Sequence, residues 1–151
     1  MRRTDTTRPA VASKDPGGPL GDASSGATIM TTTEIGRRYV ALCREGKRGE
    51  VIDTLFAKDV VSVEAVAPPG ADRTAKGIEA VRGKSKWWAE NNTLHKAELS
   101  GPYPHDDRFA VRFVLDVTNK QGGERKTVDE IGVFTVVDGK ITKEEFFYPV
   151  G

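Results

Sequence analysis

The chain has 151 residues, 37% of them hydrophobic, and its formal net charge is +1 with 23 basic and 22 acidic residues. This length suits one domain with one core, and the balanced charge gives no reason to expect a nucleic-acid or membrane partner. One cysteine, Cys43, and two histidines, His95 and His105, exclude an internal disulfide, a thiolate metal cluster and a histidine triad. We therefore expect a small-molecule ligand, no metal or cofactor, and a reducing location, the cytoplasm.

Residues 1–30 differ in composition from the rest of the chain. They are rich in Pro, Gly, Ser and Thr and contain no aromatic residue. Such a segment has too little apolar surface to offset the entropy lost on ordering. Arg2 and Arg3 are followed by no apolar run of the kind that an export signal requires. We expect a disordered leader over residues 1–30 and one domain over residues 31–151.

Three amphipathic helices are predicted in the first part of the domain. Thr31-x-x-Glu34 is a capping box and starts the first helix, whose apolar face carries Ile35, Tyr39, Leu42 and Cys43. A short second helix should end near Lys58, and a third should run from about Ile78 to Glu90. The β-branched run from Val60 to Val66 between them predicts a strand, followed by a loop.

The second half of the chain predicts antiparallel sheet. Apolar residues alternate with others over residues 109–118, and further strands are expected over residues 125–137 and 140–148. Asp138-Gly139 is a dipeptide favoured in type I′ hairpin turns, where both residues have positive φ. Three helices followed by a curved meander indicate an α+β fold, with the helices packed on one face of the sheet.

Several segments, taken in order, resemble signatures of the nuclear transport factor 2-like superfamily, and its SnoaL-like branch fits best. They are Arg38-Tyr39-Val-Ala-Leu, Leu55-Phe56-Ala-Lys-Asp59-Val-Val-Ser-Val-Glu64, Gly77-Ile-Glu-Ala-Val81, Val137-Asp-Gly-Lys-Ile141 and Glu145-Phe146-Phe147-Tyr148. The resemblance implies a curved antiparallel sheet, a cone-like half barrel, with a pocket between it and three helices. Members of the superfamily include isomerases, polyketide cyclases, hydrolases and proteins without catalysis, so this fold does not specify a reaction.

Two candidate catalytic residues come from the similarity to ketosteroid isomerases. Glu64 matches the position of their acidic proton shuttle, and a carboxylate in an apolar cavity is suited to proton transfer near neutral pH. The alternative is that Glu64 lies on the exposed face of an edge strand. Tyr39 matches their hydrogen-bond donor to the enolate oxygen, although its place on an apolar helix face equally suits the core. The third isomerase group, a protonated aspartate, has no match, since Val128 and Glu130 stand near that place.

Glu130 and Glu145 form a further candidate pair, because each interrupts an apolar strand of the predicted hairpin. Counting outward from the turn sets Glu130 opposite Phe147 and Gly132 opposite Glu145, so the two carboxylates would be diagonal neighbours on one face. Like charges at such a separation raise one pKa and provide an acid and a base. A face turned to solvent, or a bulge of one residue that reverses either side chain, would remove this arrangement.

Four aromatic side chains are candidates for substrate binding. They are Trp87, Trp88, Phe134 and Phe147, although one of the two tryptophans is expected in the core. We expect either a cofactor-independent acid–base enzyme that acts on a small apolar carbonyl compound, or a protein that binds a small ligand without converting it. The outer side of the sheet should need covering, which predicts a homodimer.

Overall fold

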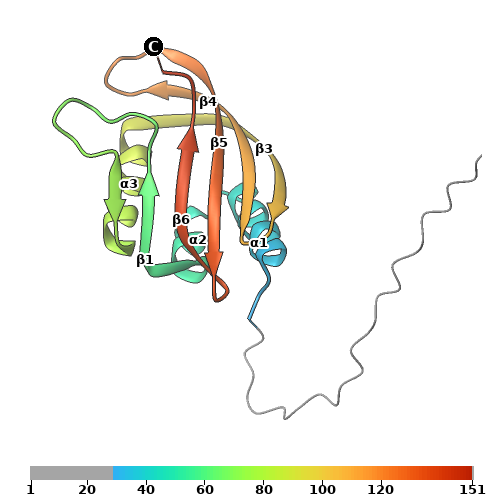
Figure 1. Ribbon diagram of the computed structural model, residues 1–151. Helices are drawn as coiled ribbons and strands as arrows, with labels where there is room; N and C mark the ends of the chain where they lie inside the picture. Colours follow the sequence, from blue (N-terminus) through green and yellow to red (C-terminus); the bar gives the residue numbers. More distant parts are fainter. Residues whose placement is uncertain (1–28, 151) are drawn as a thin grey trace, which may run out of the picture.

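The computed structural model describes residues 29–150, so the leader predicted for residues 1–30 falls almost wholly outside the described part. The described residues form three helices and six strands (Figure 1). The elements are α1 (Thr32–Arg44), α2 (Arg48–Leu55), β1 (Phe56–Val63), β2 (Thr74–Lys76), α3 (Ile78–Asn91), β3 (Asn92–His105), β4 (Arg108–Asn119), β5 (Arg125–Val137) and β6 (Lys140–Phe147).

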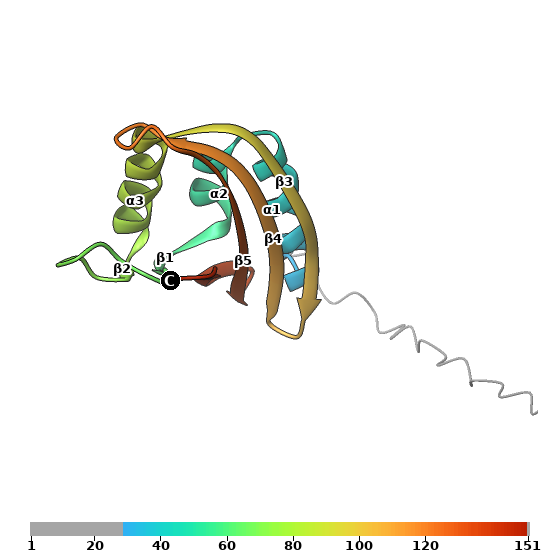
Figure 2. The same cartoon turned by 90° about the horizontal axis from the view of Figure 1, so that it is seen from above.

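The six strands form one mixed sheet that is not closed, in the order β2-β1-β6-β5-β4-β3. Neighbouring strands are antiparallel except β1 and β6, which are parallel, so the carboxyl ends of these two strands lie side by side. The sheet curves around the helices, and Figure 2 shows α1 and α2 on its concave side and α3 beside its β1–β2 edge. The α+β class and the placement of the three helices are confirmed.

The first helix begins as predicted. Thr31 is its N-cap, its hydroxyl accepts from the Glu34 amide at 3.2 Å, and the Glu34 carboxylate accepts from the Thr31 amide at 3.3 Å. Ile35, Tyr39 and Leu42 are buried on its inner face. Two details differ from the prediction: the strand after α2 begins earlier, at Phe56, and β2 lies where a loop was expected. Three residues are too few for an alternating pattern to mark β2 in the sequence.

The predicted register of the β5–β6 hairpin is wrong beyond its first pairs. Asp138 and Gly139 have φ of 49° and 74°, as a type I′ turn requires, and Val137 pairs with Lys140. The register then shifts between Thr135 and Val136, so that Gly132 pairs with Phe146 and Ile131 with Phe147. Beyond this irregularity each β6 side chain lies on the face opposite to the predicted one, because side chains alternate along a strand. Glu144, rather than Glu145, therefore lies on the inner face with Phe134.

Aromatic rings fill the space between α1 and the sheet. The Tyr39 ring lies 4.4 Å from that of Phe134, which stacks on Phe109 at 4.8 Å. Gly132 permits this packing, since a Cβ there would lie 2.8 Å from the Phe134 ring. Phe113 and Phe146 continue the cluster toward the other end of the sheet. No helix among residues 29–150 is long and apolar enough to span a membrane.

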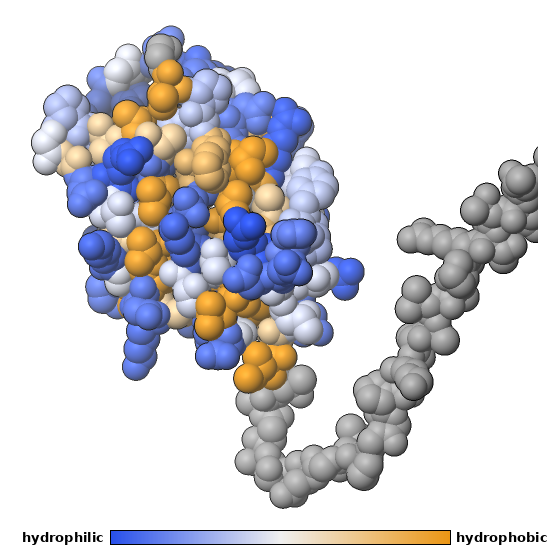
Figure 3. Space-filling view, in the orientation of Figure 1, coloured by the Kyte–Doolittle hydropathy of each residue, from blue (hydrophilic) through white to orange (hydrophobic). Residues whose placement is uncertain are grey.

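The outer face of the sheet carries exposed apolar side chains among charged ones. Tyr103 of β3, Ile131 of β5 and Phe147 of β6 are exposed by 61%, 37% and 53%. Arg112 and Asp129 form an ion pair at 2.8 Å on neighbouring strands of this face. Figure 3 views the molecule from this side and shows hydrophobic side chains interspersed with hydrophilic ones.

Candidate functional site

A buried ion pair lies at the centre of the inner polar groups. Arg48, the first residue of α2, places Nη2 3.2 Å from both carboxylate oxygens of Glu144 on β6. The Glu144 side chain is only 1% exposed, whereas that of Arg48 is 32% exposed and reaches inward to it. Arg48 Nη1 also donates to the Tyr39 hydroxyl at 3.0 Å. Burial, the largest single effect, would lower the pKa of Arg48, but the charges of Glu144, Tyr39 and Cys43 and the hydrogen bond to Glu144 together outweigh it. The net shift is upward, so Arg48 stays charged.

Ser62 and Lys84 extend this pair toward α3. Ser62 lies beside Glu144 in the parallel β1–β6 pairing, is fully buried, and donates from Oγ to Glu144 Oε1 at 2.8 Å. Lys84 of α3 donates to the same Ser62 Oγ at 2.7 Å. Its ammonium also lies 5.1 Å from the centre of the Phe146 ring, within the range of a cation–π contact. Side chains from α2, β6, β1 and α3 are thus joined into one hydrogen-bonded series.

Glu64 ends this series, directly after the last residue of β1. Its carboxylate forms an ion pair with Lys84 through Oε1 and accepts from the Tyr148 hydroxyl through Oε2 at 3.0 Å. The alternation of β1 places Glu64 on the same side as Ser62. Burial and the charge of Glu64 raise the pKa of Tyr148, so this phenol remains a donor near neutral pH. Both Glu64 oxygens therefore face donors.

Glu130 lies in a different environment on the inner face of β5. It pairs across the sheet with Phe113 and is partly buried. Burial first, and then the charge of Glu64, raise the pKa of the Glu130 carboxyl to about 7. The charge of Glu144 acts in the same direction, while Lys84 and Arg48 oppose it. A carboxyl with this pKa exchanges its proton readily near neutral pH, which is the requirement for a general acid or base.

A hollow of about 340 Å³ borders Glu64 at the carboxyl ends of β1 and β6. It is lined by Val63, Glu64, Ala65, Arg73, Glu145, Phe146 and Phe147. Its volume lies at the lower end of the range usual for small-molecule sites. Glu64 and Phe146 belong both to this hollow and to the surroundings of Lys84.

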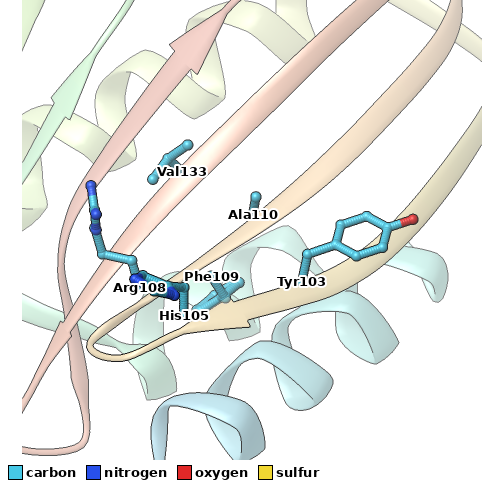
Figure 4. A pocket seen from close by; sticks show the side chains of 6 residues that line it. All are labelled: Tyr103, His105, Arg108, Phe109, Ala110 and Val133. Carbon is cyan, nitrogen blue, oxygen red and sulfur yellow. The ribbon is translucent and has the colours of Figure 1, made fainter.

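A smaller hollow of about 120 Å³ lies beside the β3–β4 turn, between Tyr103, His105, Arg108, Phe109, Ala110 and Val133 (Figure 4). It is too small for most organic ligands. No group of three or more His, Cys, Asp or Glu side chains within residues 29–150 is arranged to hold a metal ion.

The predicted catalytic residues separate in the structure. Glu64 and Glu130 come together near Lys84, whereas Glu145 lies on the outer face and pairs with Lys143 at 3.2 Å. The predicted diagonal pair of Glu130 and Glu145 on one face is therefore wrong, because of the register shift in the hairpin. Tyr39 lies in the aromatic core, where burial raises its pKa well above the usual value.

The predicted substrate-binding residues differ in accessibility. Phe134 is fully buried, whereas Phe147 lines the larger hollow from the outer face. Trp87 and Trp88 are 56% and 37% exposed near the end of α3, so the expectation that one of them lies in the core is wrong. The sequence reasoning missed Arg48, Ser62, Lys84, Glu144 and Tyr148.

The comparison with protein families gives one match, in which the model for a SnoaL-like domain covers residues 30–148. The chain belongs to the SnoaL-like domain family. A SnoaL-like protein from Mesorhizobium loti, proposed to be a polyketide cyclase and also described as a carbohydrate phosphatase, is 43% identical to it. The similarity covers 79% of this chain and all of that one, with a TM-score of 0.75. No curated protein matches the chain.

More distant solved structures share the fold of this SnoaL-like chain. A protein of unknown function with a cystatin-like fold from Xanthomonas campestris is 16% identical, with a TM-score of 0.66 over 80% of this chain and 92% of that one. TerC, co-crystallised with polyporic acid, is 18% identical, with a TM-score of 0.59 over 76% of this chain and 92% of TerC. At these identities the likeness concerns the fold alone.

Proposed function

We propose that this SnoaL-like protein is an acid–base enzyme that moves a proton on a small apolar carbonyl compound. The observation that carries the proposal is Glu130, a partly buried carboxyl whose pKa is raised to about 7 beside the Lys84 ammonium and the Glu64 carboxylate. Strongly shifted pKa values gather at functional sites, because such shifts match a group to proton transfer at working pH.

Two neighbouring carboxylates have different roles in this proposal. Glu64 is held between the Lys84 ammonium and the Tyr148 hydroxyl. Glu130 lies in a drier place, where burial favours the neutral form. Glu64 therefore fixes Lys84 and raises the pKa of Glu130, and Glu130 carries the proton. The sequence left open whether Glu64 or the pair of Glu130 and Glu145 provides the acid and the base, and this proposal selects Glu130.

The chemistry follows from these roles. Ionised Glu130 removes a proton from the carbon next to a carbonyl group, and the C–H electron pair moves to form an enolate. Lys84 donates to the oxygen on which this negative charge develops, an interaction that is stronger in the transition state than in the ground state. Glu130 then returns the proton to the same carbon or to another one. Electrons and protons balance without a further reactant.

The hollow at Glu64 and Phe146 is the place that we propose for the substrate. Two phenylalanines on its lining suit an apolar molecule, and Arg73 and Glu145 at its border offer polar contacts. The relatives support a small organic ligand, since one is described as a polyketide cyclase and another was crystallised with polyporic acid. We place this reaction in the cytoplasm, because a chain with the single, half-buried Cys43 forms no internal disulfide and suits a reducing compartment.

Hydrogen–deuterium exchange tests the proposal without knowledge of the natural substrate. The probes are 2-tetralone and 1-indanone in D₂O, with loss of the proton signal next to the carbonyl followed by NMR. The protein should accelerate exchange, and Glu130→Gln should reduce this acceleration about a hundredfold or more. Glu98→Gln, which changes the same residue type at an exposed position of β3 away from the hollow, is the matched control and should leave the rate unchanged.

Three outcomes would count against this assignment. Exchange at the uncatalysed rate with both ketones would contradict the enzyme proposal, and an unmodified compound found by mass spectrometry of the purified protein would favour ligand binding without conversion. Loss of exchange in Glu64→Gln together with full activity in Glu130→Gln would make Glu64 the base.

We also propose that two copies pair through the outer face of the sheet. Tyr103, Ile131 and Phe147 are exposed there on three different strands. Apolar side chains spread over one sheet face and mixed with polar ones are typical of protein interfaces.

A further inference from the structure

A series of buried polar contacts leads from Arg48 to Lys84 through Glu144 and Ser62. Each of these residues comes from a different element, namely α2, β6, β1 and α3. The distances are 3.2 Å from Arg48 to Glu144, 2.8 Å from Ser62 to Glu144 and 2.7 Å from Lys84 to Ser62. Glu144 and Ser62 are both fully buried, so bulk water has no access to the middle of the series.

The direction of these hydrogen bonds is determined by chemistry. A carboxylate paired with a guanidinium only accepts, so the single Ser62 proton points to Glu144. An ammonium only donates, so Lys84 must use a lone pair of the Ser62 oxygen. The Ser62 hydroxyl cannot rotate without losing its bond to Glu144, and Arg48 fixes the Glu144 carboxylate through both oxygens.

We propose that Ser62, Glu144 and Arg48 are positioning residues that hold the Lys84 ammonium at the site. Lysine has a long flexible side chain, and a surface ion pair alone orders it poorly. Here the ammonium is bound from two sides, by the buried Ser62 oxygen and by the Glu64 carboxylate. The catalytic part of this inference rests on the proposed function, in which Lys84 stabilises an enolate oxygen.

Ser62→Ala tests the proposal, because it removes the contact to Lys84 and leaves the Arg48–Glu144 pair in place. The first measurement is the titration of the Glu130 carboxyl by ¹³C NMR, which needs no substrate. Lys84 lowers the pKa of Glu130 in the intact protein. The titration midpoint should therefore rise in Ser62→Ala and rise further in Lys84→Met. In the double variant Ser62→Ala/Lys84→Met it should equal that of Lys84→Met, because Ser62 acts through Lys84.

The second measurement is proton exchange of 2-tetralone. Because the Lys84 ammonium is no longer oriented by Ser62, kcat should fall in Ser62→Ala by about 10- to 100-fold with little change in KM. Val60→Ala is the matched control, since Val60 is equally buried on the same side of β1 but makes no polar contact to Lys84. It should lower stability and leave both the titration and kcat unchanged. Ser62→Cys, with only a weakly hydrogen-bonding group, replaces Ser62→Ala if that variant does not fold.

The possible outcomes separate the two proposals. A Glu130 midpoint in Ser62→Ala equal to that of the wild type, or an effect of Ser62→Ala that persists undiminished in the Lys84→Met background, would overturn the positioning role. Midpoints that shift as expected in a protein that exchanges no ketone would support the positioning role and contradict the proposed function.

Discussion

Three glutamates near the inner face of the sheet occupy three different electrostatic environments. Glu144 is buried against the Arg48 guanidinium, Glu64 is bound by Lys84 and Tyr148, and Glu130 is partly buried with a pKa raised to about 7. The environment of each carboxylate, rather than its residue type, therefore determines its chemistry. Glu130 combines burial with a pKa of about 7, so its proton is exchanged near neutral pH.

The raised pKa of Glu130 predicts a pH-dependent stability. The pKa of Glu130 rises from 4.5 in the unfolded chain to about 7 in the folded protein. The contribution of protonated Glu130 to the stability of the fold is therefore complete below about pH 4.5 and is lost as the pH rises through about 7. The side chain at position 130 does not titrate in Glu130→Gln. The free energy of unfolding of the variant minus that of the wild type should therefore be about 2 kcal/mol larger at pH 8.5 than at pH 5, an increasing advantage of the variant. Urea denaturation at the two pH values measures this. An advantage of the same size at both would show that Glu130 titrates normally.

At the scale of elements, the β5–β6 hairpin decides which glutamate enters the interior. Glu144 and Glu145 are adjacent, and the register shift near Thr135 places Glu144 inside and Glu145 outside. Glu144→Gln leaves Arg48 without a partner for its buried charge and should lower the free energy of unfolding by about 3–5 kcal/mol. Glu145→Gln should change it by less than about 0.5 kcal/mol, as usual for surface positions. Chemical denaturation of both variants checks this pair, and equal effects would contradict the register.

The sequence predicts most of the elements and part of the site, for identifiable reasons. Alternation in β1 places Ser62 with Glu64, and helical spacing from Val81 toward Trp88 includes Lys84, so these two were accessible to pattern reasoning. Glu144 was not accessible in this way, because one irregular step in the pairing of a hairpin places every later side chain on the opposite face of the sheet. Arg48 stands between Gly46 and Gly49 and shows no periodicity. Its role arises only from the tertiary contact of α2 with β6.

At the scale of the whole molecule, the curved sheet divides the protein into two functional faces. The inner face carries the core and the candidate site, and the outer face carries exposed apolar residues on β3, β5 and β6. The same strands serve both faces, because successive side chains point to opposite sides. Pairing through the outer face would cover this apolar surface, including Phe147 at the border of the hollow, and leave the Glu130 side of the sheet free.

The outer face predicts a homodimer. Light scattering at micromolar protein should give the mass of two chains, since an interface of standard size persists at that concentration. Ile131→Asp places a charge on the outer face and should produce monomers. Leu94→Asp is the matched control, because Leu94 is 47% exposed but pairs with inward-facing Val117 on the other side of the sheet. A monomeric wild type would contradict the pairing.

The central claim, that Glu130 transfers the proton, is tested most directly by the pH dependence of 2-tetralone exchange. With the uncatalysed rate subtracted, kcat should rise with pH around a midpoint near 7, as Glu130 ionises, and then reach a plateau. Glu130→Gln should lack this rise, whereas the control Glu98→Gln should retain it. A wild-type rate that is constant between pH 5.5 and 8.5, or a midpoint near 7 that remains in Glu130→Gln, would contradict the assignment of Glu130 as the base.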